Sequence, residues 1–392
     1  MKKRIDSATV ALFLTVTVGF AVAFWLVPDR AFSASENRVL QTLPSPSVRS
    51  WFEGTLPMHL SDYYTDQIPL RSELLGLAST AQIAVGRGEA NGVLWDGHDR
   101  LAVRRFDAYL DRATRAEDTD LFDRTHIEAS MEAVAALDAG LDLPVTLLIA
   151  PRVIDVTGGD FGYPAALSDK LHDAILAAAA DGGIDNVDLW DTLRTMHDQG
   201  EAAYYRTDHH WTTQGAYTAY RAILTSWGME AEALPVDAFT VRDIPDFYGT
   251  SWSRAGLYGV SPDTLEIWEA PDDGSYAVLD GDGNVLLRGF IDESYLATKD
   301  KYGAFLGGTH RLIRIESTLD TDNRRPRLLV ARDSFASTVI PFLARHFDIV
   351  AVDLAGGVTD LSAHASRYGC DRVLILCNAE NLVTGDALLR IQ

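Results

Sequence analysis

Short apolar segments alternate with amphipathic helical patterns along most of the chain, and this alternation constrains the fold more than any other feature. The strongest strand-like segments cover residues 145–150, 327–331, 348–354 and 372–377. Helical patterns lie before and between them, at residues 118–137, 164–180, 192–199, 214–227, 335–346 and 359–368. Strands that alternate with helices pair in parallel and are covered on both faces. We therefore predict an α/β fold with a parallel sheet flanked by helices.

Residues 230–325 interrupt the alternation. They contain short segments of alternating polarity joined by turns rich in Gly and Asp, which is typical of antiparallel strands. We predict a β-rich insertion that departs from the main sheet. Residues 280–284 (DGDGN) look like the start of a calcium loop, but an EF-hand requires Gly at position 6 and Glu at position 12. Val285 and Ile291 occupy those positions, so we predict a hairpin turn.

The N-terminal region contains a stretch long and apolar enough to cross a membrane. Residues 7–27 carry no charge, and these 21 residues give roughly 31 Å of helix at about 1.5 Å per residue. Lys2, Lys3 and Arg4 precede the stretch, so the positive-inside rule places the N-terminus in the cytoplasm and the bulk of the chain outside it. The alternative is a cleaved signal peptide, whose apolar core is shorter, about 7–15 residues. We favour an uncleaved single-pass anchor in the cell membrane.

These features divide the chain into three expected parts. Residues 1–30 form a cytoplasmic tip and the membrane anchor. Residues 31–110 form a mixed segment that packs on the core, beginning with an extended stretch rich in Pro and Ser at 31–57. Residues 111–392 form the α/β domain with its β-rich insertion.

The charge of the chain excludes one class of partner. The formal net charge is −22, with 56 acidic and 34 basic residues. Binding of nucleic-acid phosphates requires a basic face, so we expect no nucleic-acid partner, and the same charge disfavours docking on anionic lipid headgroups. The sequence does not indicate a cofactor.

Ser334 follows an apolar strand and precedes a helical pattern, in the order Asp333-Ser334-Phe335. In open parallel sheets, ligands bind at the carboxyl ends of the strands. A serine at this position has its backbone N–H at a helix N-terminus, where developing negative charge is favoured. Ser334 is therefore a candidate nucleophile. The alternative is that it only caps the helix.

A carboxylate and two imidazoles occupy consecutive positions at Asp208, His209 and His210. Together with Ser334 they supply the parts of an activated serine nucleophile, with His210 as the general base and Asp208 orienting its ring. If the segment is extended, the two imidazoles point to opposite faces, so only one would face the serine. One alternative is a capping turn before the next helix. Another is a metal site, but two His and one Asp without a further partner nearby are weak evidence for a metal, and we expect none.

Residues 205–212 (YRTDHHWT) resemble the signature of the DHHW protein family. That family is similar to the acetyltransferase domains of alginate O-acetylation proteins, which have an SGNH-hydrolase-like core. Further segments support the resemblance and cover nearly all of the chain beyond the predicted anchor. They are residues 35–38 with Leu40 and Pro44, 66–71, 91–94, 247–250, 332–335 with 341–343, and 374–378.

The resemblance implies an SGNH-hydrolase-like fold and roles for particular residues. In the alginate proteins the pattern Asp-x-His-Trp is followed much later by a serine after a strand. This pattern maps onto Asp208, His210 and Ser334 and leaves His209 at the variable position. The chain departs from typical SGNH enzymes at Arg332, where they have the Gly of Gly-Asp-Ser. That departure bears on the shape of the turn and on the oxyanion contacts.

Three other polar residues are candidates for oxyanion or substrate contacts. Asn378, at the end of a predicted strand, is our candidate for a side-chain oxyanion donor beside the Ser334 N–H, and Asn381 is the second choice. An Asn after a strand is also a common turn residue. Arg152 follows the strand at 145–150 at the same rim, where it would contact an anionic or sugar substrate or form a surface ion pair.

A second serine segment competes with Ser334. Residues 249–253 (GTSWS) resemble the glycine-flanked serine segment around the nucleophile of the alginate proteins. This segment follows residues 246–248 (DFY) rather than a buried apolar strand. We therefore expect Ser251 to line the cleft rather than to act as the nucleophile.

Two functional hypotheses of different classes follow. The first is a membrane-anchored extracytoplasmic SGNH-like O-acyltransferase or esterase that moves an acyl group, by the resemblance acetyl, onto or off a cell-envelope polysaccharide. The resemblance also implies a multi-spanning membrane O-acyltransferase as a partner. The second is a non-catalytic envelope protein that binds glycans or scaffolds an assembly on the same fold. Its stacking surfaces would be aromatic residues of the 204–258 region: Tyr204, Tyr205, Trp211, Trp252 and Tyr258.

Overall fold

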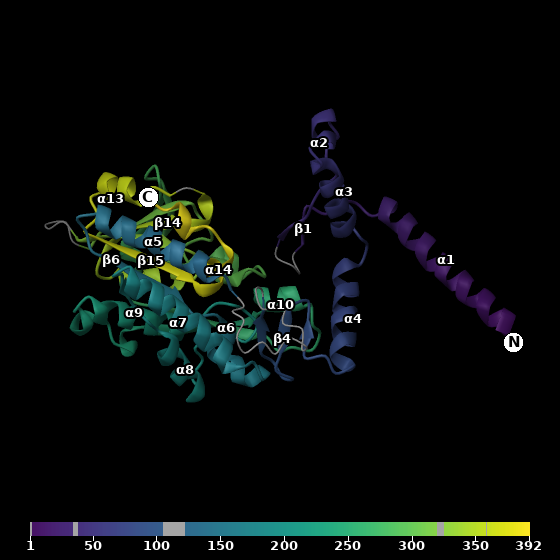
Figure 1. Ribbon diagram of the computed structural model, residues 1–392, viewed down its shortest axis with the longest axis horizontal. Helices are drawn as coiled ribbons and strands as arrows, with labels where there is room; N and C mark the ends of the chain where they lie inside the picture. Colours follow the sequence, from purple (N-terminus) through teal and green to yellow (C-terminus); the bar gives the residue numbers. More distant parts are fainter. Residues whose placement is uncertain (1, 34–37, 105–121, 320–324, 358) are drawn as a thin grey trace. The chain divides into compact units, whose positions relative to one another are not determined.

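We describe a computed structural model of the chain, which covers residues 2–33, 38–104, 122–319, 325–357 and 359–392 (Figure 1). These residues form two compact units. The first contains residues up to 91 together with 253–259, and the second contains residues 92–252 and 260–392. Residues 35–37 of the family resemblance, the start of the helical pattern at 118 and the boundary expected after residue 110 lie outside the described residues.

The first unit begins with a long apolar helix, α1 (Lys2–Leu26). Its Ser7–Leu26 segment reaches a mean hydropathy of 2.1 over an 18-residue window, and none of that window is buried. By length and composition this helix is able to cross a membrane. It fits a single-pass anchor or a signal sequence.

Three helices follow in the first unit, and the first of them and the start of the second lie within the stretch that was expected to be extended. They are α2 (Val48–Phe52), α3 (Thr55–Asp66) and α4 (Arg71–Ala84). The predicted extended stretch at 31–57 is therefore wrong from residue 48 onward. The cause is a capping box: the Ser50 N–H donates to Ser47 Oγ at 3.0 Å, and the Ser47 N–H donates to Ser50 Oγ at 3.1 Å. Serine takes the place of the usual Glu or Gln, so the sequence signal is weak.

An eight-stranded sheet forms the centre of the second unit, in the order β11-β10-β12-β14-β13-β15-β6-β7. The strands from β14 to β7 pair in parallel, as predicted, whereas β12, β10 and β11 pair antiparallel. The strand bounds are β6 (Val145–Ala150), β7 (Asp185–Asn186), β10 (Tyr276–Asp280), β11 (Val285–Arg288), β12 (Leu312–Ser317), β13 (Arg327–Arg332), β14 (Asp348–Asp353) and β15 (Arg372–Asn378).

The insertion at 230–325 is β-rich, but the expectation that it departs from the main sheet is wrong for β10, β11 and β12. These strands extend the sheet beyond β14, because β10 and β12 bury apolar side chains such as Val278 and Ile315, both fully buried. The strands β8 (Thr240–Phe247) and β9 (Asp263–Glu269) form a separate antiparallel pair. Residues 280–284 form the predicted hairpin turn between β10 and β11.

Helices cover both faces of the sheet because successive residues of each buried strand point to opposite sides. In β13, Leu328 and Val330 join one core cluster, whereas Leu329 and Ala331 join the other. The first cluster includes residues of α6 (Val153–Thr157), α8 (Trp190–Asp198), α9 (Thr213–Ser226) and α12 (Ala336–Leu343). The second includes residues of α5 (Arg124–Gly140), α7 (Ala165–Asp181), α13 (Leu361–Tyr368) and α14 (Ala379–Thr384).

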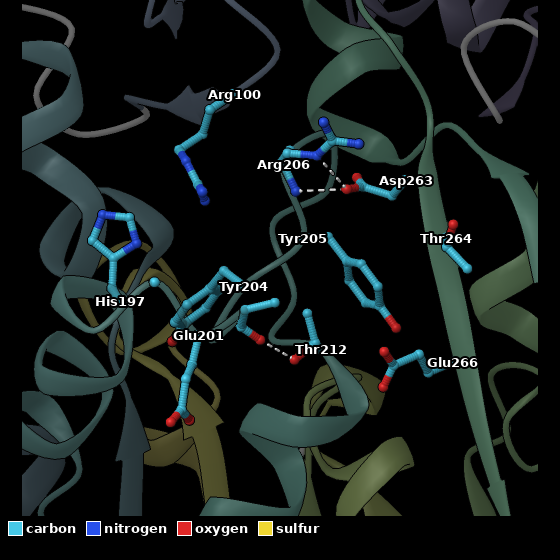
Figure 2. A pocket seen from close by; sticks show the side chains of 12 residues that line it. Arg100, His197, Glu201, Tyr204, Tyr205, Arg206, Thr212, Asp263, Thr264 and Glu266 are labelled. Atoms are coloured by element: carbon cyan, nitrogen blue, oxygen red, sulfur yellow. Dashed lines mark hydrogen bonds and ion pairs between the residues drawn. The ribbon is translucent and has the colours of Figure 1, made fainter. Parts of the chain in front are cut away.

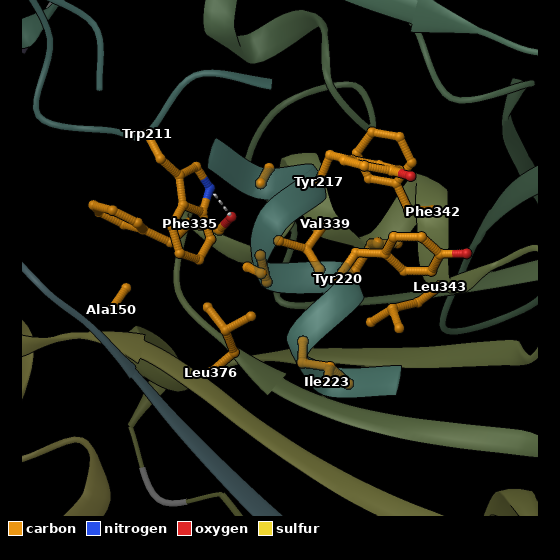
Figure 3. Close-up of a cluster of buried hydrophobic side chains, with 14 of the residues drawn as sticks. Ala150, Trp211, Tyr217, Tyr220, Ile223, Phe335, Val339, Phe342, Leu343 and Leu376 are labelled. Atoms are coloured by element: carbon orange, nitrogen blue, oxygen red, sulfur yellow. Dashed lines mark hydrogen bonds between the residues drawn. The ribbon is translucent and has the colours of Figure 1, made fainter. Parts of the chain in front are cut away.

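The packing of α9 against α12 sets the position of the segment before α9. Tyr220 of α9 stacks on Phe342 of α12, with ring centroids 5.5 Å apart (Figure 3). Thr212 caps α9 by accepting a hydrogen bond from the Gly215 N–H at 3.1 Å. The residues immediately before Thr212, which include the Asp-His-His-Trp segment, are thus held near the start of α12.

The strands that carry the candidate residues end at one edge of the sheet. Arg332 at the end of β13 pairs with Leu376 of β15, and Asn378 at the end of β15 pairs with Ala150 at the end of β6. Ser334 therefore lies at the carboxyl edge of the parallel strands, where ligands bind in open α/β sheets.

Candidate active site

The structure brings Ser334, His210 and Asp208 together in a hydrogen-bonded row. The Ser334 Oγ lies 2.7 Å from His210 Nε2, and His210 Nδ1 lies 2.5 Å from Asp208 Oδ1. The Asp208 and His210 side chains are buried and Ser334 is half-buried. With the proton on Nδ1, which the carboxylate favours, Nε2 accepts the proton of the Ser334 hydroxyl. The row has the geometry of an activated serine.

The two imidazoles lie side by side rather than on the opposite faces expected for an extended segment, and His210 is the one that contacts Ser334 Oγ. The ring centroids of His209 and His210 are 3.9 Å apart. That expectation applies to extended backbone, but residues 206–210 form consecutive bends inside the bridge between Tyr204 and Trp211. His209 is the more exposed of the two, and its Nδ1 contacts the Thr250 hydroxyl.

Trp211 holds this segment against α12. Its side chain is fully buried, and its indole N–H lies 2.9 Å from Thr338 Oγ1 and 3.1 Å from the Phe335 carbonyl oxygen. Figure 3 shows the indole beside Phe335. Because no face of its ring is exposed, Trp211 offers no surface to a substrate. Tyr204 and Tyr205 are also buried, so these three proposed stacking residues are structural.

Asp208 is fixed by contacts on both carboxylate oxygens. Oδ1 accepts the His210 backbone N–H at 2.9 Å, and Oδ2 accepts the Thr250 N–H at 2.6 Å and its hydroxyl at 2.9 Å. Burial raises the pKa of Asp208, but the charges of His210 and His209 and these hydrogen bonds outweigh burial and hold it well below its usual range. Asp208 is therefore ionised at neutral pH and stabilises positive charge on the adjacent imidazole.

Tyr302 is a site residue that sequence reasoning missed. It lies in the short helix η5 (Lys301–Ala304) of the insertion, and its ring stacks on His210 with centroids 3.9 Å apart. Its hydroxyl donates to the Ser334 carbonyl oxygen at 3.2 Å. Burial raises the pKa of Tyr302 well above its usual value, so the group stays neutral. No local pattern marks Tyr302, because the fold of the insertion alone brings it to His210.

Asp333 organises the turn that presents Ser334. Its carboxylate accepts the Phe335 N–H at 2.9 Å, the Asn378 N–H at 2.7 Å and the Asn381 side-chain amide at 2.7 Å. Burial raises the pKa of Asp333 despite these hydrogen bonds. The turn is thus tied to the end of β15, which fixes the position of Ser334 relative to the sheet.

The structure gives both predicted side-chain oxyanion donors other hydrogen-bond partners. The Asn378 amide nitrogen donates to the carbonyls of Ala150 and Pro151, each at 3.2 Å, and its oxygen accepts the Glu380 N–H as the cap of α14. The amide nitrogen of Asn381, the second choice, donates to Asp333. Asn378 therefore has the structural role of a cap at the turn between β15 and α14. The Ser334 N–H has no hydrogen-bond partner among the described residues, and it lies in the turn just before α12.

Arg152, Ser251 and Arg332 are all buried. Arg152 forms a two-pronged ion pair with Asp155, at 2.6 and 2.7 Å. An ion pair was one of the two expectations for Arg152, but this pair is buried inside the protein rather than at the surface. Ser251 is fully buried and its hydroxyl lacks a hydrogen bond, so it does not line an open cleft. Arg332 turns inward, with its guanidinium 3.4 Å from Ser337 Oγ, and it leaves the turn at Ser334 intact.

The same segment contains the donor atoms that could hold a metal ion. One ligand atom from each of Asp208, His209 and His210 lies within 4.8 Å of the others. A metal bound through His210 Nδ1 and Asp208 Oδ1 would displace the hydrogen bond between them. Metal ligation and orientation of the His210 ring by Asp208 are therefore competing uses of these atoms.

Fold and site together define an SGNH-like α/β protein with a serine, a histidine and an aspartate in a hydrogen-bonded row at the carboxyl edge of the sheet. The chain belongs to the DHHW protein family, whose sequence profile, described as "DHHW protein", matches residues 129–353.

Solved structures show the same fold. A DHHW family protein from Eubacterium siraeum superposes with a TM-score of 0.58 at 20% identity, covering 77% of this chain and 95% of that one. PatB1 from Bacillus cereus superposes with a TM-score of 0.55 at 19% identity, covering 68% of this chain and 93% of that one. A sequence relative, the "Probable alginate O-acetylase AlgJ" of Pseudomonas aeruginosa, is 49% identical over 55 residues, which is 14% of each chain.

Proposed function

We propose that the protein is a membrane-anchored extracytoplasmic O-acyltransferase or esterase that acts on a cell-envelope polysaccharide, with acetyl as the acyl group. The observation that carries the proposal is the 2.7 Å contact between Ser334 Oγ and His210 Nε2, with Asp208 behind the imidazole. Serine as nucleophile, histidine as base and aspartate as orienting group are the roles that this geometry supports.

In the first half-reaction, His210 Nε2 takes the hydroxyl proton while Ser334 Oγ attacks the acyl carbonyl carbon. The developing oxyanion lies near the Ser334 N–H at the start of α12 (Ala336–Leu343), where negative charge is favoured. The imidazolium, stabilised by the ionised Asp208, then gives its proton to the leaving group. In the second half-reaction, a sugar hydroxyl or water gives its proton to His210 and attacks the acyl-serine. The bond from the acyl carbon to Ser334 Oγ then breaks, and the imidazolium returns the proton to Ser334 Oγ.

The choice of acyl group and acceptor rests on the relatives. The sequence relative from Pseudomonas aeruginosa is named as a probable alginate O-acetylase, and the family resemblance points to the same chemistry. A multi-spanning membrane O-acyltransferase that delivers the acyl group is part of the proposal on the same ground.

Covalent labelling tests the role of Ser334. Phenylmethylsulfonyl fluoride is expected to add one sulfonyl group to the intact protein, located on Ser334 by peptide mass spectrometry, because the imidazole activates that hydroxyl. PatB1, which shares the fold, has been solved with a sulfonyl adduct. Ser334→Ala should lose the label and Ser251→Ala should keep it. A label on another residue, or labelling abolished by EDTA, would contradict the proposal.

The anchor is part of the proposal and has its own test. We expect the full-length protein to remain in the membrane pellet after alkaline carbonate washing, because the span Ser7–Leu26 of α1 places 20 uncharged, mostly apolar residues in lipid. The intact mass of the purified protein should include residues 1–27. An intact mass that matches a chain beginning near residue 35 would show a cleaved signal peptide instead.

A further inference from the structure

The helix α4 (Arg71–Ala84) of the first unit presents an apolar side to the outside. Leu70 and Leu77 are each 62% exposed, and Val85, just after the helix, is 79% exposed. Residues 74–86 carry no charge. The other exposed positions of the helix after its first turn are also apolar: Leu74, Ala78, Ala81 and Ala84. A helix that faces water normally carries charged and polar residues on this side.

The buried side of α4 is small and polar. Its buried residues are Gly76 and Ser79. A Cβ atom on Gly76 would lie 2.5 Å from the Tyr258 ring, and Ser79 Oγ accepts the side-chain N–H of Asn91 at 3.0 Å. Asn91 and residues 253–259 are also the places where the chain leaves this unit. The apolar side of α4 is therefore opposite the side on which the unit continues into the rest of the chain.

The start of α4 is held near the outer end of α1. The Tyr63 hydroxyl donates to Asp29 at 3.0 Å, and the Tyr63 ring packs on Phe24 in the last turns of α1, with centroids 5.8 Å apart. The Gln67 side chain bonds both the N–H and the carbonyl oxygen of Arg30, each at 2.9 Å. Gln67 precedes α4 by four residues, which span at most about 14 Å at about 3.5 Å per residue. An α1 that crosses the bilayer thus brings the first turn of α4 to the membrane surface.

The charge of this part of the chain does not oppose contact with a membrane. Residues 1–91 carry eight basic and eight acidic side chains, so the net charge of −22 belongs to residues 92–392. The repulsion expected from anionic headgroups therefore concerns the second unit rather than α4.

We propose that the apolar side of α4 lies in the surface of the lipid bilayer, at the boundary between headgroups and acyl chains. The proposal rests on the membrane anchor of the proposed function, because α1 brings α4 to the lipid. Burial of apolar surface contributes about 25 cal/mol per Å², and an interfacial helix obtains it from lipid alone. A protein partner is usually gripped through aromatic or Arg side chains, and the exposed positions from Leu74 to Val85 include neither.

Quenching by lipid tests the proposal on the full chain in phosphatidylcholine vesicles. Both native cysteines are buried, so a single cysteine added at an exposed position accepts an NBD fluorophore selectively. With lipids brominated on their acyl chains, the label on Leu77→Cys should lose roughly half of its emission or more, because interfacial helices insert about 5–10 Å. Thr264→Cys is the aqueous control and should keep its emission, since Thr264 is exposed on the second unit next to the Arg206–Asp263 pair (Figure 2).

A label in α1 separates failure of the docking from failure of the anchor. Trp25, near the end of α1, is 76% exposed, and Trp25→Cys should be quenched because it lies in the span. Quenching of Trp25→Cys without quenching of Leu77→Cys would overturn the docking of α4 and leave the anchor standing. Absence of quenching at both positions would contradict the anchor and the docking together. Equal quenching of Leu77→Cys and Thr264→Cys would overturn the docking as well.

A charge placed on the apolar side provides a second test. Adding Leu74→Glu to the Leu77→Cys chain should bring the quenching toward the Thr264→Cys level, because a carboxylate resists transfer into lipid. Leu286→Glu, at an exposed position of β11, should leave the quenching unchanged. Both residues are exposed, so neither change should lower the unfolding temperature. A Leu77→Cys label that is blue-shifted but unaffected by brominated lipid would show that protein covers this side, and it would overturn the proposal. Loss of sulfonyl labelling at Ser334 with quenching retained would contradict the proposed catalysis alone.

Discussion

Replacing Ser334 by alanine is expected to lower the hydrolysis of p-nitrophenyl acetate by about 10³-fold or more, to a residual rate set by binding and the oxyanion contacts. The reason is that Ser334 Oγ is the hydroxyl within hydrogen-bonding distance of the buried His210 ring. The measurement is kcat/KM for the purified protein, with circular dichroism to establish that the variant is folded.

Matched variants sharpen this result. Ser251→Ala should retain its rate, because that buried hydroxyl makes no hydrogen bond. The double variant Ser334→Ala with His210→Ala should be no slower than Ser334→Ala, since residues that act as one unit are not additive. Equal loss in Ser251→Ala and Ser334→Ala, or additive losses in the double variant, would exclude the serine–histidine mechanism.

Gly249→Ala is expected to disable the site through Asp208. A methyl group on Gly249 would lie 2.2 Å from Asp208 Cβ and 2.3 Å from its Oδ2, far inside van der Waals contact. The Asp208 side chain must move, and it then loses its hydrogen bonds to Thr250 and His210. We expect kcat to fall by about 10²-fold or more, because small displacements of catalytic groups are that costly. Stability should fall by about 1–3 kcal/mol from overpacking.

A second glycine of the same unit provides the control for Gly249→Ala. Gly274 has no atom within 4 Å of an added methyl group, so Gly274→Ala should change neither kcat nor the unfolding temperature. Combining Gly249→Ala with Asp208→Asn should give less than the sum of their separate losses in activation free energy, because both act on one carboxylate. Full activity of Gly249→Ala would show that Asp208 tolerates displacement, and its orienting role would be wrong.

The parallel part of the sheet could be predicted because its signal is local. Buried strands such as β6 and β13 are short, apolar throughout and followed by helical patterns, and these properties depend on neighbouring residues only. The meeting of Ser334 and His210, 124 positions apart, could be predicted for two reasons. The strand end fixes where the serine lies, and the family motif supplies the matching histidine.

The features that sequence reasoning missed depend on contacts between distant segments. Tyr302 reaches His210 only because the insertion folds back onto the main sheet. Asn378 and Arg152 carry side chains suited to ligand binding, yet partners supplied by the fold engage both. The orientation of His209 depends on a bend that periodicity does not report. In each case the residue type was informative, but tertiary structure set the direction of the side chain.

The position of β15 has a consequence for how the protein is made. This strand is the last of the sheet in the sequence, yet it lies in the middle, between β13 and β6. A nascent chain cannot join β6 to β13, or tie the turn at Asp333 to the end of β15, until β15 itself has been synthesised.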